Sequence, residues 1–168
     1  GTHDTVDREL PVHVTLALGM PANDRMDALV EKATELGVAA IQPLMTERSV
    51  LRLSGERADK RVEHWRGVAI AAAEQCGRTQ VPQIAPVRTL DDWLGQAPTH
   101  EAAARTRWLL SFADTVPLAQ AVGDAGPAVQ VLSGPEGGLS TAEEARARSL
   151  GFRGVSLGAR VLRADTAP

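Results

Sequence analysis

The segment LSGPEGGLS (132–140) places a single carboxylate, Glu136, among three glycines and a proline. It follows the apolar run AVQVL, which is typical of a buried strand, and it leads into the capping-box pattern STAE (140–143), which predicts a helix start. Glycines let the backbone approach a ligand closely, and N–H groups at a helix start bind polar or anionic groups. We therefore expect a strand–loop–helix site with Glu136 as its acid or base. An equally open interpretation is that Glu136 only accepts hydrogen bonds from the first N–H groups of that helix.

Two further segments of unusual composition follow predicted strands. They are LLSFAD (109–114) and VSLGARVLRADTA (155–167), and the second contains two arginines. Ligands of parallel sheets collect outside the carboxyl ends of the strands, so three such loops predict one polar pocket lined by backbone. Neither G-x-G-x-x-G nor G-x-x-x-x-G-K-[ST] is present, so the sequence does not indicate a dinucleotide or triphosphate site.

The elements that position these loops alternate between strand and helix. Strands are predicted at 12–19, 39–45, 107–113, 128–134 and 154–158, and helices from Asn23 or Asp24 to Gly37 and at 57–76, 115–122 and 140–151. Trp65 belongs to the apolar face of the second helix and is expected in the core. Pro43 predicts that the second strand is either imperfect or at an edge, and Thr115 is expected to cap the third helix. This alternation favours an α/β fold with a mostly parallel sheet flanked by helices.

The composition narrows the class of protein. The 168 residues suit one domain, and 43% hydrophobic against 3% aromatic residues predict an aliphatic core. A net charge of −3 does not by itself indicate a nucleic-acid-binding protein. The single cysteine, Cys76, excludes an internal disulfide, and the four histidines form no ligand pair, so we expect no metal site. No apolar run is long enough to span a membrane, and a cytoplasmic location is the default expectation.

The glycine loop and the last segment together are similar to a known signature. SGPEGGLS followed by VSLGARVLRADTA closely resembles the RsmE family, bacterial methyltransferases that methylate N3 of a uridine in 16S ribosomal RNA. EKATELGVAAIQPLMTERSV, LSGERADKRVEHW and EQCGRTQVPQI resemble the same family in the same order, so the resemblance covers about residues 12–167. It implies a SPOUT-type α/β domain with a deep trefoil knot at the C-terminal end. Asp165 stands where members usually have glutamate.

The resemblance also implies a domain organisation and partners. Residues 1–10 would be a linker from an N-terminal PUA-like domain, and residues 11–168 the SPOUT methyltransferase domain without its last helix. The expected partners are 16S ribosomal RNA or the small ribosomal subunit, and a second copy of the chain in a homodimer.

The resemblance further implies the cofactor S-adenosylmethionine (SAM) and a set of site residues. Glu136 and Arg163 would be catalytic, with Arg163 stabilising negative charge on the uracil, and Arg48, Arg78 and Arg163 would contact RNA. The residues implied in cofactor binding lie in the three loops: Leu110, Ser111, Ser133, Gly134, Pro135, Glu136, Gly137, Gly138, Ser156, Leu157, Gly158, Arg160, Val161 and Leu162.

Two other functions stay open at this point. A SPOUT ribose 2′-O-methyltransferase would share the pocket and differ in the atom that is methylated. A non-catalytic nucleotide-binding α/β module would bind SAM without turnover, or would not bind it.

Overall fold

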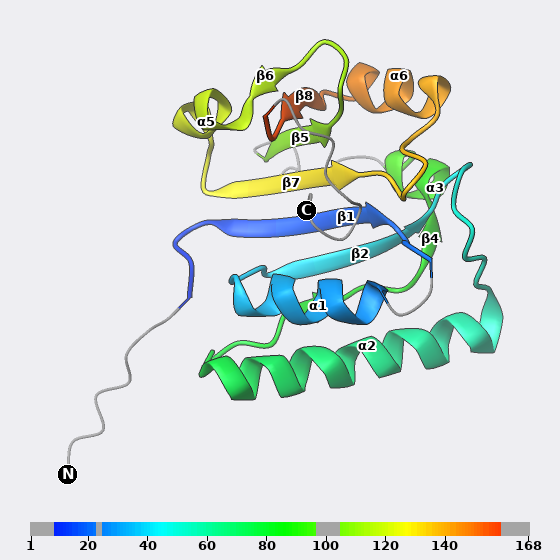
Figure 1. Cartoon of the computed structure of the whole chain (residues 1–168), viewed down its shortest axis with the longest axis vertical. Coiled ribbons are helices and arrows are strands. Elements are labelled where there is room, and N and C mark those ends of the chain that lie inside the picture. Colours follow the sequence, from blue (N-terminus) through cyan, green and yellow to red (C-terminus); the bar gives the residue numbers. More distant parts are fainter. Residues whose placement is uncertain (1–8, 23–24, 97–104, 159–168) are drawn as a thin grey trace.

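The computed structural model describes residues 9–22, 25–96 and 105–158. They form an eight-stranded sheet in the order β3-β2-β1-β7-β5-β8-β6 (Figure 1). The remaining strand, β4, also pairs with β2, further along it than β3 does. Every pairing in the sheet is parallel. The predicted class, an α/β fold with a parallel sheet flanked by helices, is confirmed. The strands are β1 (His13–Gly19), β2 (Ala40–Met45), β3 (Gln83–Ile84), β4 (Arg88–Thr89), β5 (Thr106–Leu110), β6 (Val116–Pro117), β7 (Ala128–Ser133) and β8 (Arg153–Ser156).

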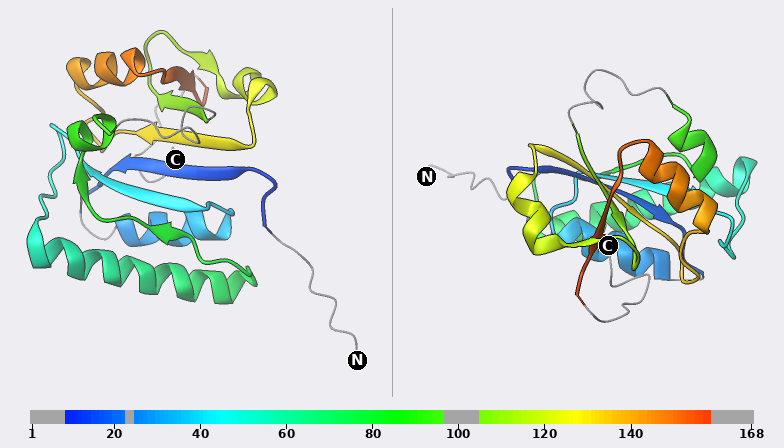
Figure 2. Two further views of the ribbon diagram at one scale, coloured as in Figure 1. Left: turned by 180° about the vertical axis from the view of Figure 1, so that it is seen from behind. Right: turned by 90° about the horizontal axis from the view of Figure 1, so that it is seen from above.

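Helices cover both faces of the sheet. The two longest helices, α1 and α2, lie against one face, and α3 and α6 lie against the other (Figures 1 and 2). The helical elements are α1 (Arg25–Glu35), α2 (Gly55–Cys76), α3 (Leu90–Leu94), α5 (Leu118–Ala121), the 3-10 helix η1 (Val122–Asp124) and α6 (Thr141–Ser149). α2 ends at Gly77, which adopts the left-handed conformation (φ 73°) and donates its N–H to Ala73 O.

The core follows the alternation of side chains along β1. Leu16 and Leu18 pack with residues of α1 and α2, whereas Ala17 between them packs with residues of α3 and α6 on the opposite face. Trp65 of α2 is 1% exposed, and its indole N–H donates to Asp27 Oδ1 of α1 at 3.1 Å. The prediction that Trp65 is a core residue is confirmed, and its hydrogen bond ties the two helices together.

Pro43 lies in an inner strand, so of its two predicted alternatives the edge position is wrong and the imperfect strand is confirmed. Ile41 O of β2 accepts from Ala85 N at 2.9 Å, which means that the odd-numbered residues of β2 direct their backbone toward β3 and β4. β3 pairs with the start of β2 and β4 with its end, so the missing N–H of Pro43 faces the break between them. Gln42 closes this break, because its side-chain amide donates to Pro86 O at 2.8 Å.

The predicted cap at Thr115 is also wrong. The chain instead remains extended through β6, where Val116 pairs with Val155 of β8, and α5 begins only after Pro117. A β ladder has here replaced the first helical turn. The expected cap of α1 at Asn23 or Asp24 lies outside the described residues, as do the linker 1–8, the loop 97–104 and the segment 159–168 of the expected knot.

Within the described residues, no helix is both long enough and apolar enough to cross a membrane. The same part of the chain holds no group of three or more His, Cys, Asp or Glu side chains that could bind a metal ion.

Candidate functional site

Three neighbouring strands bring the predicted loops together. β5 lies between β7 and β8, with Leu109 paired to Leu132 and Leu110 to Val155. The N–H of Ser111 continues this ladder and donates to Val155 O at 3.2 Å. Because all three strands are parallel, their carboxyl ends lie side by side at one edge of the sheet. The loops that begin near Ser111, Ser133 and Ser156 therefore start from a common edge, as the sequence predicted.

The glycine loop 134–138 is folded tightly on itself. A Cβ on Gly134 would lie 2.7 Å from Leu139 N and from the carbonyl carbon of Gly138, so no side chain fits there. Gly138 donates its N–H to Pro135 O at 2.8 Å and has a φ of 69°. These two glycines are therefore required by the turn itself, before any ligand is considered.

Glu136 is fixed by the turn that follows β1. Its Oε1 accepts from Ala22 N at 2.9 Å and from Arg25 Nη1 at 3.1 Å, and its side chain is 31% exposed. The alternative role, accepting from the first N–H groups of the next helix, is wrong because α6 has its own caps. Ser140 Oγ accepts from Glu143 N, and Glu143 Oε2 accepts from Ser140 N, so the predicted capping box is confirmed.

A cavity of about 510 Å³ opens between the glycine loop, the loop 111–114 and α6. Ser111 donates its hydroxyl to Glu144 Oε2 at 2.8 Å. Arg148, also on α6, donates to Ala113 O at 2.7 Å and lies 3.7 Å from Glu144 Oε2. These bonds hold the loop after β5 against α6, so the cavity wall is fixed by side chains of both signs. Asp114, at the end of this wall, has a φ of 47°.

Phe112 stands at the rim of this cavity with 77% of its surface exposed. The other phenylalanine of the chain, Phe152, is only 5% exposed and packs in the core. An exposed aromatic ring beside polar and charged groups is suited to stacking on an unpaired base. Phe112 is not among the residues predicted from the sequence, although its position directly after the polar end of a strand could have indicated it.

Arg48, in the turn after β2, contacts the glycine loop. Its Nη1 donates to Gly137 O at 2.8 Å, and its methylene groups would lie 3.4–3.5 Å from a Cβ on Gly137. The turn that carries Arg48 is closed by Thr46 and Ser49, since Thr46 N donates to Ser49 Oγ at 2.9 Å. Arg48 also lines the cavity, so this predicted RNA-contacting residue is at the site.

Arg78 is not at the site, and its buried position does not fit the RNA contact expected from the sequence. Its side chain is 5% exposed and points into the molecule, where Nη1 donates to Thr34 O at 2.8 Å and to Val38 O at 2.9 Å. Nε and Nη2 donate to Glu9 Oε2 at 3.0 and 2.5 Å. The hydrogen bond from Arg78 lowers the pKa of Glu9 below its ordinary value. Arg78 thus joins the ends of α1 and α2 to the N-terminal segment.

The remaining predicted residues divide into two groups. Ser156 ends β8, Leu157 and Gly158 follow it at the same edge of the sheet, and Leu157 is 39% exposed. Arg160, Val161, Leu162 and Arg163 lie outside the described residues. Arg25, Glu144 and Arg148 are also not among the residues predicted from the sequence. Only the i, i+4 spacing of Glu144 and Arg148 on one helix could have indicated that they act together.

Comparison with known proteins identifies the class to which this fold and site belong. The sequence pattern of the RNA methyltransferase domain matches residues 8–168, so the chain belongs to the RNA methyltransferase domain family. Two curated relatives bear the name ribosomal RNA small subunit methyltransferase E. The protein from Bacillus subtilis (strain 168) is 32% identical over 96% of the chain, and that from Synechocystis sp. is 36% identical over 95%. The predicted relationship to the RsmE family is confirmed.

Solved structures agree with this relationship. The ribosomal RNA small subunit methyltransferase E from Neisseria gonorrhoeae, bound to S-adenosyl methionine, is 40% identical and covers 98% of the chain with a TM-score of 0.87. A putative methyltransferase from Legionella pneumophila, in complex with the bound cofactor SAM, is 35% identical over 96% of the chain with a TM-score of 0.84. The chain spans 64% and 52% of the lengths of the two curated relatives, and 66% and 64% of the two solved chains.

Proposed function

We propose that this chain is the catalytic domain of a SAM-dependent methyltransferase that methylates N3 of a uridine in 16S ribosomal RNA. The observation that carries the proposal is the meeting of the ends of β7, β5 and β8 beside a cavity, with Glu136 held in place at its rim. Family membership and the two similar structures that hold SAM support the choice of cofactor and reaction.

The residues at this edge fit such a cofactor. A volume of about 510 Å³ is within the ordinary range of ligand sites. Glu136 and Glu144 line the cavity and can balance the cofactor's positive charges, while the glycine loop offers backbone groups. We propose that the cofactor site comprises Leu110, Ser111, Ser133–Gly138, Ser156–Gly158 and Arg160–Leu162. When bound, SAM supplies a methyl group on a positively charged sulfur, which makes that methyl electrophilic.

The chain's own residues have to prepare the uracil nitrogen. N3 of uracil carries a proton, and its lone pair becomes nucleophilic only when this proton leaves. Glu136 accepts that proton. Both of its hydrogen bonds, from Ala22 and Arg25, end on Oε1, so Oε2 is the oxygen assigned to the substrate. Arg163 stabilises the negative charge that remains on the uracil oxygens, and Phe112 stacks on the ring.

The test of this function measures the product as well as the cofactor. Calorimetric titration with SAM is expected to give one binding event. Incubation with SAM and with small ribosomal subunits that lack the modification is expected to give 3-methyluridine in nucleoside mass spectrometry. The appearance of 2′-O-methyluridine would favour the ribose methyltransferase, and SAM binding without any transfer would favour the binding module.

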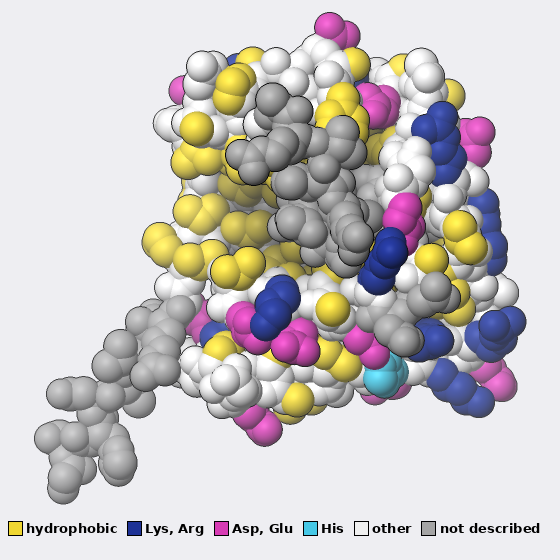
Figure 3. Space-filling model, viewed as in Figure 1, with side chains coloured by type: hydrophobic (Ala, Val, Ile, Leu, Met, Phe, Trp, Pro, Cys, Tyr) yellow, Lys and Arg dark blue, Asp and Glu magenta, His cyan; other side chains and the backbone are white. Residues whose placement is uncertain are grey.

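We further propose the assembly that the resemblance implies. Residues 11–168 form the SPOUT domain with a deep trefoil knot, and residues 1–10 connect it to a PUA-like domain; the greater length of the relatives supports a further domain. The domain forms a homodimer. Hydrophobic side chains gather over the starts of β1 and β7 (Figure 3), and this supports a surface that a second copy of the chain covers. Light scattering is expected to give twice the mass of the chain. The enzyme works in the cytoplasm, where ribosomal RNA is modified.

A further inference from the structure

Positive side chains gather at the edge of the sheet that carries the candidate site, although the whole chain has a net charge of −3. Figure 3 shows dark blue side chains along the right of the molecule, the side on which the strands end and on which α1 and α2 begin. The first turns of α2 contribute Arg57, Lys60 and Arg61, here called the basic track. Their i, i+3 and i+4 spacing places the three on neighbouring positions of the helix surface.

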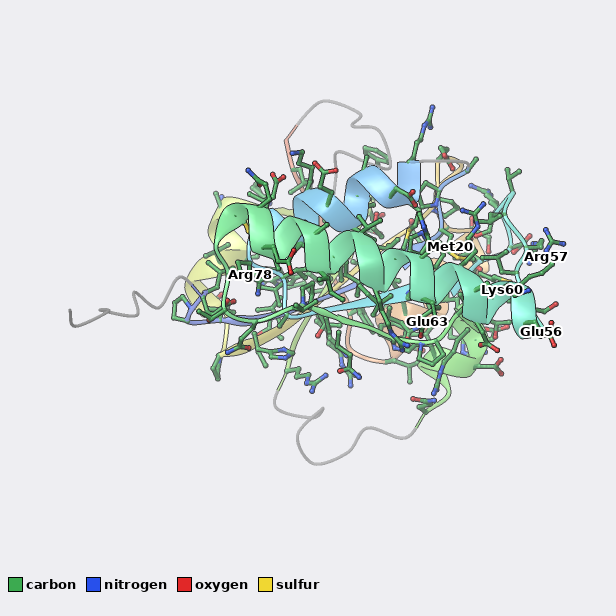
Figure 4. All side chains as sticks on the ribbon, turned by 90° about the horizontal axis from the view of Figure 1, so that it is seen from below. Met20, Glu56, Arg57, Lys60, Glu63 and Arg78 are labelled. Atoms are coloured by element: carbon green, nitrogen blue, oxygen red, sulfur yellow. The ribbon has the colours of Figure 1, made fainter. Side chains whose placement is uncertain are left out.

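The side chains of the basic track are free of ion pairs within the described residues, although Glu56, Asp59 and Glu63 belong to the same turns of α2. Arg57, Lys60 and Arg61 are all exposed, and none forms an ion pair within the described part of the chain. Figure 4 shows Arg57 on the side of α2 that faces α1, with Glu56 and Glu63 on the other side. By contrast, Lys32, Arg66 and Arg153 each have an acidic partner within 4 Å.

Beyond the basic track, contacts between side chains join α2 to α1 and α1 to Glu136. One turn beyond Arg61, His64 Nε2 lies 2.6 Å from Asp27 Oδ2 at the start of α1. Arg25, in the same first turn of α1, is 45% exposed and reaches Glu136 Oε1 at 3.1 Å. These two contacts place the start of α1 between the first turns of α2 and the carboxylate of the candidate site.

We propose that the basic track binds the phosphate backbone of the RNA strand that presents its uridine to the Glu136 loop. This inference rests on the proposed function and adds the direction from which the RNA approaches, over α2 and α1. Forked guanidinium groups suit phosphate oxygens, and contacts with phosphates supply affinity that does not depend on sequence. An enzyme that acts on one base needs such contacts, because the base alone offers few atoms to hold a long strand.

The test compares two triple variants with the same change of net charge. In the first, Arg57, Lys60 and Arg61 are each replaced by Gln. In the control, Lys32, Arg66 and Arg153 are each replaced by Gln; these three side chains are 63%, 45% and 53% exposed, and they lie elsewhere on the surface. The probe is a fluorescein-labelled single-stranded RNA of about 20 nucleotides, which is long enough to cover the track. Its binding is measured by anisotropy between about 50 and 200 mM salt, where affinity depends strongly on phosphate contacts.

Loss of three phosphate contacts lowers the slope of log K against log salt by about 2, and it weakens binding about tenfold or more at 0.1 M salt. We expect this result for the track variant, and a change of less than about threefold for the control. SAM affinity is expected to be unchanged in both variants. An unaltered slope in the track variant, an equal loss in the control, or no RNA binding by the unsubstituted chain would overturn the proposal. Failure of the proposed function is distinguishable, because it would leave salt-dependent RNA binding by the track without methyl transfer.

Discussion

Replacing Arg78 by Met tests whether this buried arginine is structural or contacts RNA. The substitution keeps an unbranched apolar side chain about as long as the arginine stem, and it removes the guanidinium that joins Glu9, Thr34 O and Val38 O. Each lost bond to a carbonyl costs about 1 kcal/mol, and the charge-assisted bond to Glu9 costs about 1.5–3 kcal/mol. The total of about 3–5 kcal/mol agrees with the usual cost of removing one partner of a buried ion pair.

The assay is thermal and urea unfolding followed by circular dichroism. For a domain of 168 residues, a loss of about 4 kcal/mol lowers the midpoint temperature by roughly 8–16 °C. Arg66→Met is the matched control, because the Arg66–Glu63 pair is on the surface, with side chains 45% and 67% exposed. Such a pair contributes about 0–1 kcal/mol. An Arg78→Met protein that unfolds like the unsubstituted chain, and that binds RNA more weakly, would refute the structural role.

Three further predictions concern Glu9 and the candidate site. Because the folded-state pKa of Glu9 is lowered, the stability that Glu9 contributes is present above its unfolded pKa of about 4.3 and is lost as the pH falls through the lower folded value. Urea unfolding of Glu9→Gln should therefore show a deficit at pH 7 that shrinks between about pH 5 and 3, and a constant deficit would contradict this linkage. Glu136→Gln should lower methyl transfer about 10²–10⁴-fold with SAM binding retained in calorimetry, and transfer at the original rate would remove Glu136 as the proton acceptor. Phe112→Ala should weaken RNA binding by about 1–3 kcal/mol while the unfolding midpoint stays unchanged, since the ring is 77% exposed; unaltered RNA affinity would rule out stacking.

Features that depend on neighbouring residues could be predicted from the sequence. The capping box at Ser140 and Glu143 lies within four residues, and the end of α2 at Gly77 needs only the left-handed conformation that glycine adopts readily. The apolar residues of α2 recur at helical spacing, which is also a local pattern, and this spacing predicts that Trp65 lies in the core. The strand–helix alternation gave the class of fold because parallel strands need helical crossovers.

Features that depend on distant residues could not be predicted in this way. The donors to Glu136 come from Ala22 and Arg25, more than a hundred residues earlier in the chain. The burial of Arg78 depends on carbonyl groups at the end of α1 that no local pattern around Arg78 reveals. Pro43 predicts an imperfect or edge strand because its missing N–H is a local property, whereas the break between β3 and β4 that accommodates it is a property of the sheet.

The pairing of β1 with β7 has a consequence for synthesis on the ribosome. Among the strands of this sheet β1 is made first, and its partner on one side, β7, begins only at Ala128. Until that segment leaves the exit tunnel, one edge of β1 has open backbone groups that can pair with another nascent chain. The pairing of β1 with β7 is therefore a late and slow event, because these two strands are far apart in sequence. We expect the nascent chain to be most prone to aggregation, and most dependent on chaperones, before β7 is complete.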